Sequence, residues 1–256
     1  MIFSRDHIDL GGTARSIEDV QHLHDLGLKF AEIAITNPRA FSDQVKGYKD
    51  IKDKTGLYYL CHGPREGDPN DTENLGQRYL PVIYDIISLM SILDISLLTL
   101  HLWLDPRFVR KEAIAFKVGM LCDIIKMAEE NRITICLENL SENPSHMTEP
   151  FKTLPLLYLT LDLGHAQFLT EENISYGFMD RYPERIRHVH LHDNRGGQSY
   201  LDDLHLQPGK GIIDFNRIFK GLGKIGYTGT VTLELKINEI DSCLDYVRGL
   251  LALTNA

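Results

Sequence analysis

The chain has 256 residues, of which 43% are apolar and 25% charged, a composition that is typical of a soluble globular protein. No apolar run reaches the ~20 residues that span a bilayer, no signal peptide opens the chain and no CxxC pair occurs, so the sequence predicts a cytoplasmic protein with reduced cysteines. The net charge of −9 argues against a general nucleic-acid binder, although bound metal would neutralise some of the carboxylates.

Short β-rich segments alternate with longer amphipathic segments along the whole chain. The predicted strands cover residues 1–8, 30–35, 58–62, 97–102, 133–139, 157–162, 187–193 and 230–235. Helix-like segments include residues 16–27, 77–93, 111–131 and 214–226. We expect Ser16 to cap the first helix, and Gly27 and Gly226 to end helices. This alternation predicts one (β/α)8 TIM barrel over residues 1–256, since no strand is followed by the glycine-rich phosphate loop of many open α/β sheets.

Acidic or histidine side chains stand at or near the carboxyl ends of six consecutive predicted strands, the third to the eighth. They are His62, His101, Glu138, Asp162, His190 and Glu234. A single residue of this kind is more often a packing or capping residue, but strand ends converge at the mouth of a barrel. Six in matching positions therefore predict a catalytic or polynuclear centre. A donor set of imidazoles and carboxylates without a thiolate favours Zn, Mn, Co or Fe over Ca or Mg.

The seventh strand carries three histidines at alternate positions, which places their side chains on one face. We expect His190 to be a ligand, His188 to support it from beneath and His192 to lie at the rim. The residues two positions before each candidate ligand should point inward one layer deeper. They are Leu60, Thr99, Cys136, Thr160, His188 and Thr232, and most are small or polar, which suits side chains that orient ligands.

Two loop motifs extend the set. His165 follows Asp162 by three residues, and Asp203 and His205 follow the seventh strand as a DxH pair. Each motif by itself is weak evidence for a metal site, because a DxH in a loop is usually a solvated turn. Together with the strand-end residues they point to a larger centre.

With these nine residues the sequence resembles the xylose-isomerase-like TIM-barrel superfamily, which includes endonuclease IV and the sugar phosphate isomerase/epimerase group. The resemblance runs through nearly the whole chain. The trinuclear zinc centre of endonuclease IV, carried over by type and order, implies His62, His101, Glu138, Asp162, His165, His190, Asp203, His205 and Glu234 as metal ligands. In the epimerase branch, four of them would bind a single divalent ion: Glu138, Asp162, His190 and Glu234. The family's HxxxGxG motif falls on His205 to Gly211.

Several departures favour the epimerase branch. Leu204 stands where endonuclease IV usually has an Arg between the Asp and the His, and no aromatic residue closely follows His62. Lys210 in the PGKG motif and Arg195 resemble the epimerase branch. DxH pairs also occur in sugar isomerases, so the nine residues alone leave the branch open.

Basic residues follow several strand ends in this otherwise acidic chain. They are Arg65, Arg107, Arg110, Lys111, Arg195, Lys210 and Lys236. They are either solvated loop charges or the binding residues of an anionic substrate, such as a phosphorylated sugar or one phosphodiester. A track for DNA would need a more extended basic and aromatic surface.

The sequence and the resemblance together predict a divalent-metal-dependent isomerase or epimerase that acts on a sugar or sugar phosphate through an enediolate. Glu138 and Glu234 would be the acid and base, and His165, Arg195, Lys210 and Arg65 would bind the substrate. One to three ions of Zn, Mn, Co or Mg are implied. A trinuclear zinc AP endonuclease, for which nucleic acid would be the partner, is the first alternative. A catalytically silent barrel that binds a sugar or a protein is the second. No membrane partner is expected, and the oligomeric state stays open.

Overall fold

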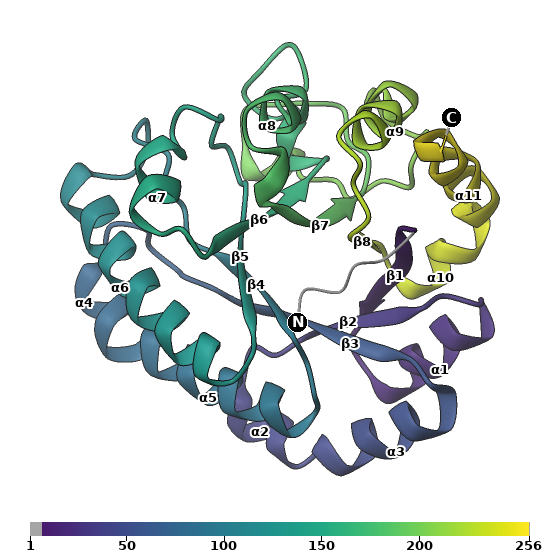
Figure 1. The fold of residues 1–256 in the computed structure, drawn as a ribbon, viewed down its shortest axis with the longest axis horizontal. Coiled ribbons are helices and arrows are strands. Elements are labelled where there is room, and N and C mark those ends of the chain that lie inside the picture. The colour runs from purple at the N-terminus through teal and green to yellow at the C-terminus, as the bar shows by residue number, and fades with distance from the viewer. Residues whose placement is uncertain (1–6, 256) are drawn as a thin grey trace.

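Eight parallel strands, paired in chain order, form a closed barrel in which β1 also pairs with β8 (Figure 1). The computed structural model describes residues 7–255. The strands are β1 (Asp9–Ala14), β2 (Phe30–Ala34), β3 (Tyr58–Arg65), β4 (Leu97–His101), β5 (Thr134–Glu138), β6 (Leu157–Asp162), β7 (Ile186–Leu191) and β8 (Thr230–Leu233). The predicted TIM barrel is therefore confirmed.

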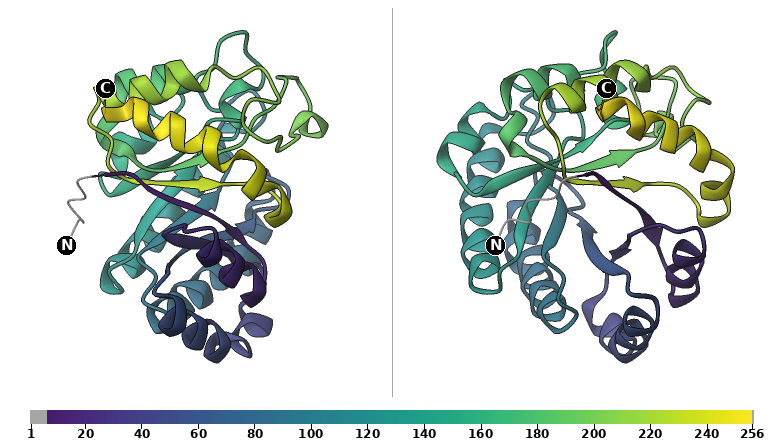
Figure 2. Two further views of the ribbon diagram at one scale, coloured as in Figure 1. Left: turned by 90° about the vertical axis from the view of Figure 1, so that its right-hand side faces the viewer. Right: turned by 45° about the vertical axis from the view of Figure 1, so that its right-hand side comes forward.

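Helices surround the barrel, and the late helices α9 and α11 lie against each other beside β8 (Figure 1, Figure 2). The helices are α1 (Ile17–Asp25), α2 (Pro38–Ser42), α3 (Val45–Thr55), α4 (Thr72–Asn74), α5 (Leu80–Ile92), α6 (Lys111–Glu130), α7 (Thr148–Thr153), α8 (Ser175–Arg181), α9 (Phe215–Lys224), α10 (Ile237–Ile240) and α11 (Leu244–Ala252). A π-helical turn, η1 (Leu75–Tyr79), joins α4 to α5, and η2 (His165–Gln167) is a single 3-10 turn after β6. Between residues 7 and 255, no helix has both the length and the apolarity needed to cross a membrane.

The predicted helix boundaries follow from local chemistry. The hydroxyl of Ser16 accepts a hydrogen bond from the backbone N–H of Asp19 at 3.2 Å, which caps α1 as expected. Gly27 and Gly226 adopt φ angles of +76° and +65° after α1 and α9. Glycine is favoured there because it has no Cβ to oppose the left-handed conformation.

Two apolar layers hold the barrel together. The larger layer lies between the strands and the helices and includes Leu98 and Leu100 from β4. The smaller layer fills the barrel interior, where Phe30, Leu60 and Cys136 pack together. Since a fully buried Leu or Phe side chain contributes about 1.5–3 kcal/mol, both layers stabilise the closed sheet.

The first strand of the barrel was not among the predicted strands. Residues 1–6 of the predicted segment lie outside the described residues, and β1 runs from Asp9 to Ala14 instead. Gly11 in this strand is paired with Phe30 on the neighbouring strand β2. A Cβ at Gly11 would lie 2.5 Å from the Phe30 ring, so glycine is required there by packing against the neighbouring strand.

Candidate metal centre

All nine residues that the sequence predicted as metal ligands gather at the mouth formed by the carboxyl ends of the strands. The strands β3 to β7 carry one residue each, in the order His62, His101, Glu138, Asp162 and His190. Glu234 follows β8 directly, and His165 opens η2. Asp203 and His205 come from the loop between β7 and α9. Parallel strands in a closed barrel bring their carboxyl ends to one place, which is why residues distant in sequence meet here.

Four of these residues form a central group, called here the quartet: Glu138, Asp162, His190 and Glu234. Each offers a ligand atom within 4.8 Å of the others. Nδ1 of His190 lies 3.4 Å from Oε1 of Glu138, 3.7 Å from Oδ2 of Asp162 and 3.5 Å from Oε2 of Glu234. Three carboxylates thus surround one imidazole nitrogen.

A second group shares Glu138 with the quartet. Oε2 of Glu138 lies 3.2 Å from Nε2 of His62 and 2.6 Å from Nε2 of His101. The other carboxylate oxygen, Oε1, faces the quartet. The two oxygens of Glu138 therefore serve two neighbouring groups of donors.

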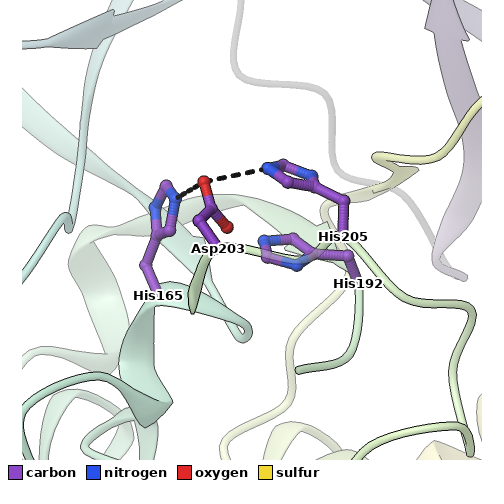
Figure 3. Close-up of side chains that lie close together, drawn as sticks. All are labelled: His165, His192, Asp203 and His205. Atoms are coloured by element: carbon purple, nitrogen blue, oxygen red, sulfur yellow. Dashed lines mark hydrogen bonds and ion pairs between the residues drawn. The ribbon is translucent and has the colours of Figure 1, made fainter. Parts of the chain in front are cut away.

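A third group, called here the Asp203 group, contains His165, His192, Asp203 and His205 (Figure 3). Oδ2 of Asp203 lies 3.4 Å from Nε2 of His165 and 3.1 Å from Nε2 of His205. The His192 ring stacks on His205 with ring centroids 4.0 Å apart.

The expected rim position of His192 was wrong, because its side chain is completely buried. Its Nε2 lies 3.1 Å from Oδ1 of Asp162, so it connects the quartet to the Asp203 group. The ring lies directly against Gly164, where a Cβ would come within 2.0 Å of it. The missing side chain of Gly164 is what admits the ring.

The donor set fits a divalent cation. Five buried atoms of the centre have no hydrogen-bond partner among the described residues: Glu138 Oε1, His190 Nδ1, His192 Nδ1, Asp203 Oδ1 and Glu234 Oε2. Buried polar atoms are rarely left unpaired, and these atoms belong to side chains that surround one another at the mouth. Imidazole nitrogens and carboxylate oxygens are the ligands that Zn, Mn or Co prefer.

The electrostatics of the centre favour positive charge within it. Burial by itself would raise the pKa of Glu138, but His101 and His190 outweigh it and hold that pKa well below its ordinary range. Burial would lower the pKa of His190, yet Glu32, Glu138 and Glu234 raise it well above its ordinary value. The carboxylates thus attract either protons or a metal ion to the same nitrogen.

Glu32, on β2, was missed by the sequence analysis. It is almost completely buried beneath the mouth, and its Oε2 lies 3.1 Å from Nε2 of His190 and 3.2 Å from Nε2 of His188. A recognisable signal was present, because Glu32 is the one charged residue in the apolar run FAEIAI and alternates with the inward Phe30. His188 lies beneath His190 as expected, but their connection runs through Glu32.

The remaining residues of the expected deeper layer divide into two kinds. Thr99 and Thr160 hydrogen-bond to each other at 2.8 Å, and Thr232 lies 3.1 Å from Nε2 of His188. Leu60 and Cys136 instead pack in the apolar floor of the barrel. These two residues therefore pack in the core and do not orient the candidate ligands as expected.

The predicted substrate residues are placed differently from one another. Arg65 and Lys210 line a cavity of about 630 Å³ whose wall also includes His205 and Glu234. Arg195 is exposed and does not line this cavity. Arg107 is engaged with Asp105, its Nη2 lying 2.6 Å from Oδ2 of that carboxylate.

Comparisons with known proteins place this geometry in context. The sequence profile of the xylose isomerase-like TIM barrel family matches residues 20–251. An uncharacterized protein of Methanocaldococcus jannaschii is 28% identical over 250 residues, which cover 93% of this chain and 95% of that protein. An inosose dehydratase of Bacillus licheniformis is 32% identical over 92 residues, or 31% of this chain and 30% of the enzyme.

Solved structures share the fold along the full chain. A D-tagatose 3-epimerase-like protein superposes with a TM-score of 0.84 at 23% identity, covering 97% of this chain and 98% of that one. The D-psicose 3-epimerase of Clostridium cellulolyticum H10, solved with D-tagatose, gives a TM-score of 0.77 at 18% identity, covering 95% and 99%. At these identities the structures establish a common architecture.

Proposed function

Because the chain belongs to the xylose isomerase-like TIM barrel family, we propose that it is a divalent-metal-dependent isomerase or epimerase that acts on a sugar. The observation that carries the proposal is the quartet, in which Glu138, His190 and Glu234 each direct a buried atom without a hydrogen-bond partner toward one another. The sugar epimerases among the similar structures and the inosose dehydratase among the relatives support a carbohydrate substrate.

The proposed chemistry uses two carboxylates that face each other across His190. An ion held by the quartet would supply Lewis-acid stabilisation of negative charge on the sugar's carbonyl oxygen. Glu138 and Glu234 would remove and return the proton on the carbon beside that carbonyl, one on each face, by way of an enediolate. Glu138 is ionised at neutral pH, as a base must be, because neighbouring imidazoles hold its pKa low.

Residues around the quartet would position the substrate. His165 lies within the centre, with its Nδ1 3.1 Å from Oε1 of Glu138, and would orient a sugar hydroxyl. Arg65 and Lys210 would act from the cavity wall, and Arg195 from the exposed loop after β7. All four belong to the proposed substrate set.

Solvent exchange tests the chemistry. We expect metal-loaded protein in deuterated water to place deuterium beside the carbonyl of at least one ketose or ketose phosphate. Glu138→Gln and Glu234→Gln should each lower turnover by roughly 10²- to 10⁴-fold, because an amide cannot accept the proton. Nuclear magnetic resonance of the recovered sugars measures both effects. The absence of exchange with every sugar in the panel would contradict the proposed reaction.

Ligand removal tests the metal assignment. Asp162→Ala or His190→Ala should lose the ion of the quartet together with activity, because each removes a donor and leaves the others unpaired. Elemental analysis of protein purified without added metal measures the loss. Full metal occupancy in folded Asp162→Ala protein would show that the quartet is not the site.

A trinuclear zinc phosphodiesterase is the second candidate function. It is favoured by the two further donor groups beside the quartet, one sharing Glu138 and the other containing Asp203. In that case about three zinc ions should bind per chain, and Asp203→Ala should lose one of them. Metal-dependent incision of a duplex at an abasic site, without deuterium exchange into any sugar, would establish this candidate over the first.

A further inference from the structure

One cavity opens from the metal centre toward the β8–β1 side of the mouth. It has a volume of about 630 Å³, and its wall includes Glu234 of the quartet and His205 of the Asp203 group. A molecule bound in it would therefore touch the proposed reaction centre. We call it the β8–β1 cavity.

Four cationic side chains line this cavity: Arg15, Arg65, Lys210 and Lys236. Arg15 follows β1, Arg65 ends β3, Lys210 belongs to the loop between β7 and α9, and Lys236 precedes α10. Four separate segments thus place cationic side chains around one cavity, although the chain has a formal net charge of −9. Scattered solvated lysines and arginines would not be expected to converge in this way.

The four cations are not paired with carboxylates in the described part of the chain. Within residues 7–255, none of them forms an ion pair, whereas Arg107 and Lys117 are paired with Asp105 and Glu66. Outside the metal centre, Glu239 is the one carboxylate that the described part of the chain contributes to the cavity wall. The wall therefore carries an excess of positive charge that an anion would balance.

We propose that the β8–β1 cavity binds the phosphate group of a phosphorylated sugar whose reacting carbons lie at the quartet. The inference rests on the proposed function and narrows its substrate from sugars in general to sugar phosphates. A phosphate monoester carries up to two negative charges and three acceptor oxygens, which matches several convergent cationic donors. Arg15 and Lys236 then join Arg65 and Lys210 as residues that determine specificity.

The cavity suits a terminal phosphate better than a nucleic-acid strand. Among residues 7–255, no Phe, Tyr or Trp lines its wall to stack with bases, and its cations converge around one space and do not form a linear track. Leu204, 45% exposed, forms an apolar part of the wall that offers nothing to a second phosphate.

Calorimetric titration of the metal-loaded protein with D-fructose 6-phosphate and D-fructose tests the inference. We expect the phosphorylated sugar to bind at least roughly tenfold more tightly, which corresponds to one charge-assisted hydrogen bond. Arg15→Gln and Lys236→Gln should each reduce this preference severalfold and leave binding of D-fructose unchanged. Lys111→Gln, which removes an exposed cation outside the cavity wall, is the matched control and should behave like the unaltered protein.

Inorganic phosphate separates the cavity from the metal ion. We expect it to bind Asp162→Ala protein, which would lack the quartet ion, and to be weakened there by Lys236→Gln. Phosphate binding that disappears in Asp162→Ala but survives Arg15→Gln and Lys236→Gln would place the anion on the ion and overturn the inference. Tighter binding of an oligonucleotide than of the sugar phosphate, lost in the same two variants, would also overturn it. Because these are binding measurements, failure of the exchange reaction would not affect them.

Discussion

At the scale of single residues, Glu32 determines which nitrogen of His190 is available. The Glu32 carboxylate accepts a hydrogen bond from Nε2 of His190 at 3.1 Å. The lone pair of the other ring nitrogen, Nδ1, is therefore free to point toward the three carboxylates of the quartet. A carboxylate behind a metal-binding imidazole holds its tautomer and its orientation. Glu32 itself is held by His188, which in turn lies 2.6 Å from the hydroxyl of Thr230.

We therefore predict that Glu32→Gln lowers the metal affinity of the quartet by roughly 10- to 100-fold, because the amide no longer fixes the imidazole as a carboxylate does. Competition with a chromophoric chelator measures the affinity. Thermal unfolding of the metal-free variant serves as the control for folding. Wild-type affinity in a variant that unfolds normally would show that Glu32 only fills space.

At the scale of elements, the loop between β7 and α9 is organised by one buried carboxylate. Oδ2 of Asp193 accepts hydrogen bonds from the backbone N–H groups of Gly209 at 2.9 Å and Gly211 at 2.8 Å. Gly209 has a φ angle of +87°, and a Cβ at Gly211 would lie 2.0 Å from the carbonyl oxygen of Asn194. The glycines of the PGKG motif are thus needed so that the loop can wrap around Asp193.

We predict that Gly211→Ala displaces this loop, which carries Asp203 and His205, while the quartet keeps its ion. Hydrogen exchange monitored by mass spectrometry should show faster exchange over residues 203–213 and unchanged exchange in the barrel strands. Gly249→Ala is the matched control, since a Cβ there meets nothing within 4 Å and should stabilise α11 by up to about 1 kcal/mol. Unchanged exchange in Gly211→Ala would mean that the loop tolerates the side chain.

At the scale of the whole molecule, the barrel separates charge from apolar packing. The floor is filled by apolar side chains such as Phe30 and Leu97, whereas buried imidazoles and carboxylates gather at the opposite end. This concentration makes stability depend on pH, because these groups bind protons differently in the folded and unfolded chains.

The direction of that dependence follows from the pKa shifts. Despite burial, neighbouring carboxylates raise the pKa values of His62, His165 and His190 and bring that of His205 to about 9. The stability from these groups is fully present below their ordinary value of 6.5 and is lost as the pH rises through the folded values. Glu32, Glu138, Asp162 and Asp203 have lowered pKa values, so their contribution is present above the ordinary carboxylate range and is lost in acid.

We predict that protein stripped of metal with a chelator loses thermal stability as the pH is raised from 6.5 to 9. Metal-loaded protein should not lose stability over this range, since the ion replaces protons on the imidazoles and binds more tightly as they dissociate. Differential scanning calorimetry at several pH values measures both. A parallel fall in the presence and absence of metal would show that these histidines do not control stability.

The sequence by itself determined the barrel and most of the mouth. Alternating strands and helices predicted the architecture, and the ends of the predicted strands identified His62, His101, Glu138 and Asp162 as neighbours. This succeeds because the carboxyl ends of parallel strands meet by topology alone, whatever the details of packing.

Only the tertiary structure decided how the side chains are paired. It placed Glu32 under His190, buried His192 against Gly164 and left Arg195 outside the cavity that Arg65 shares with Arg15 and Lys236. Contacts of this kind join strands that are distant in the chain, and they depend on closure of the barrel, strand register and side-chain volume, none of which is encoded within one short segment.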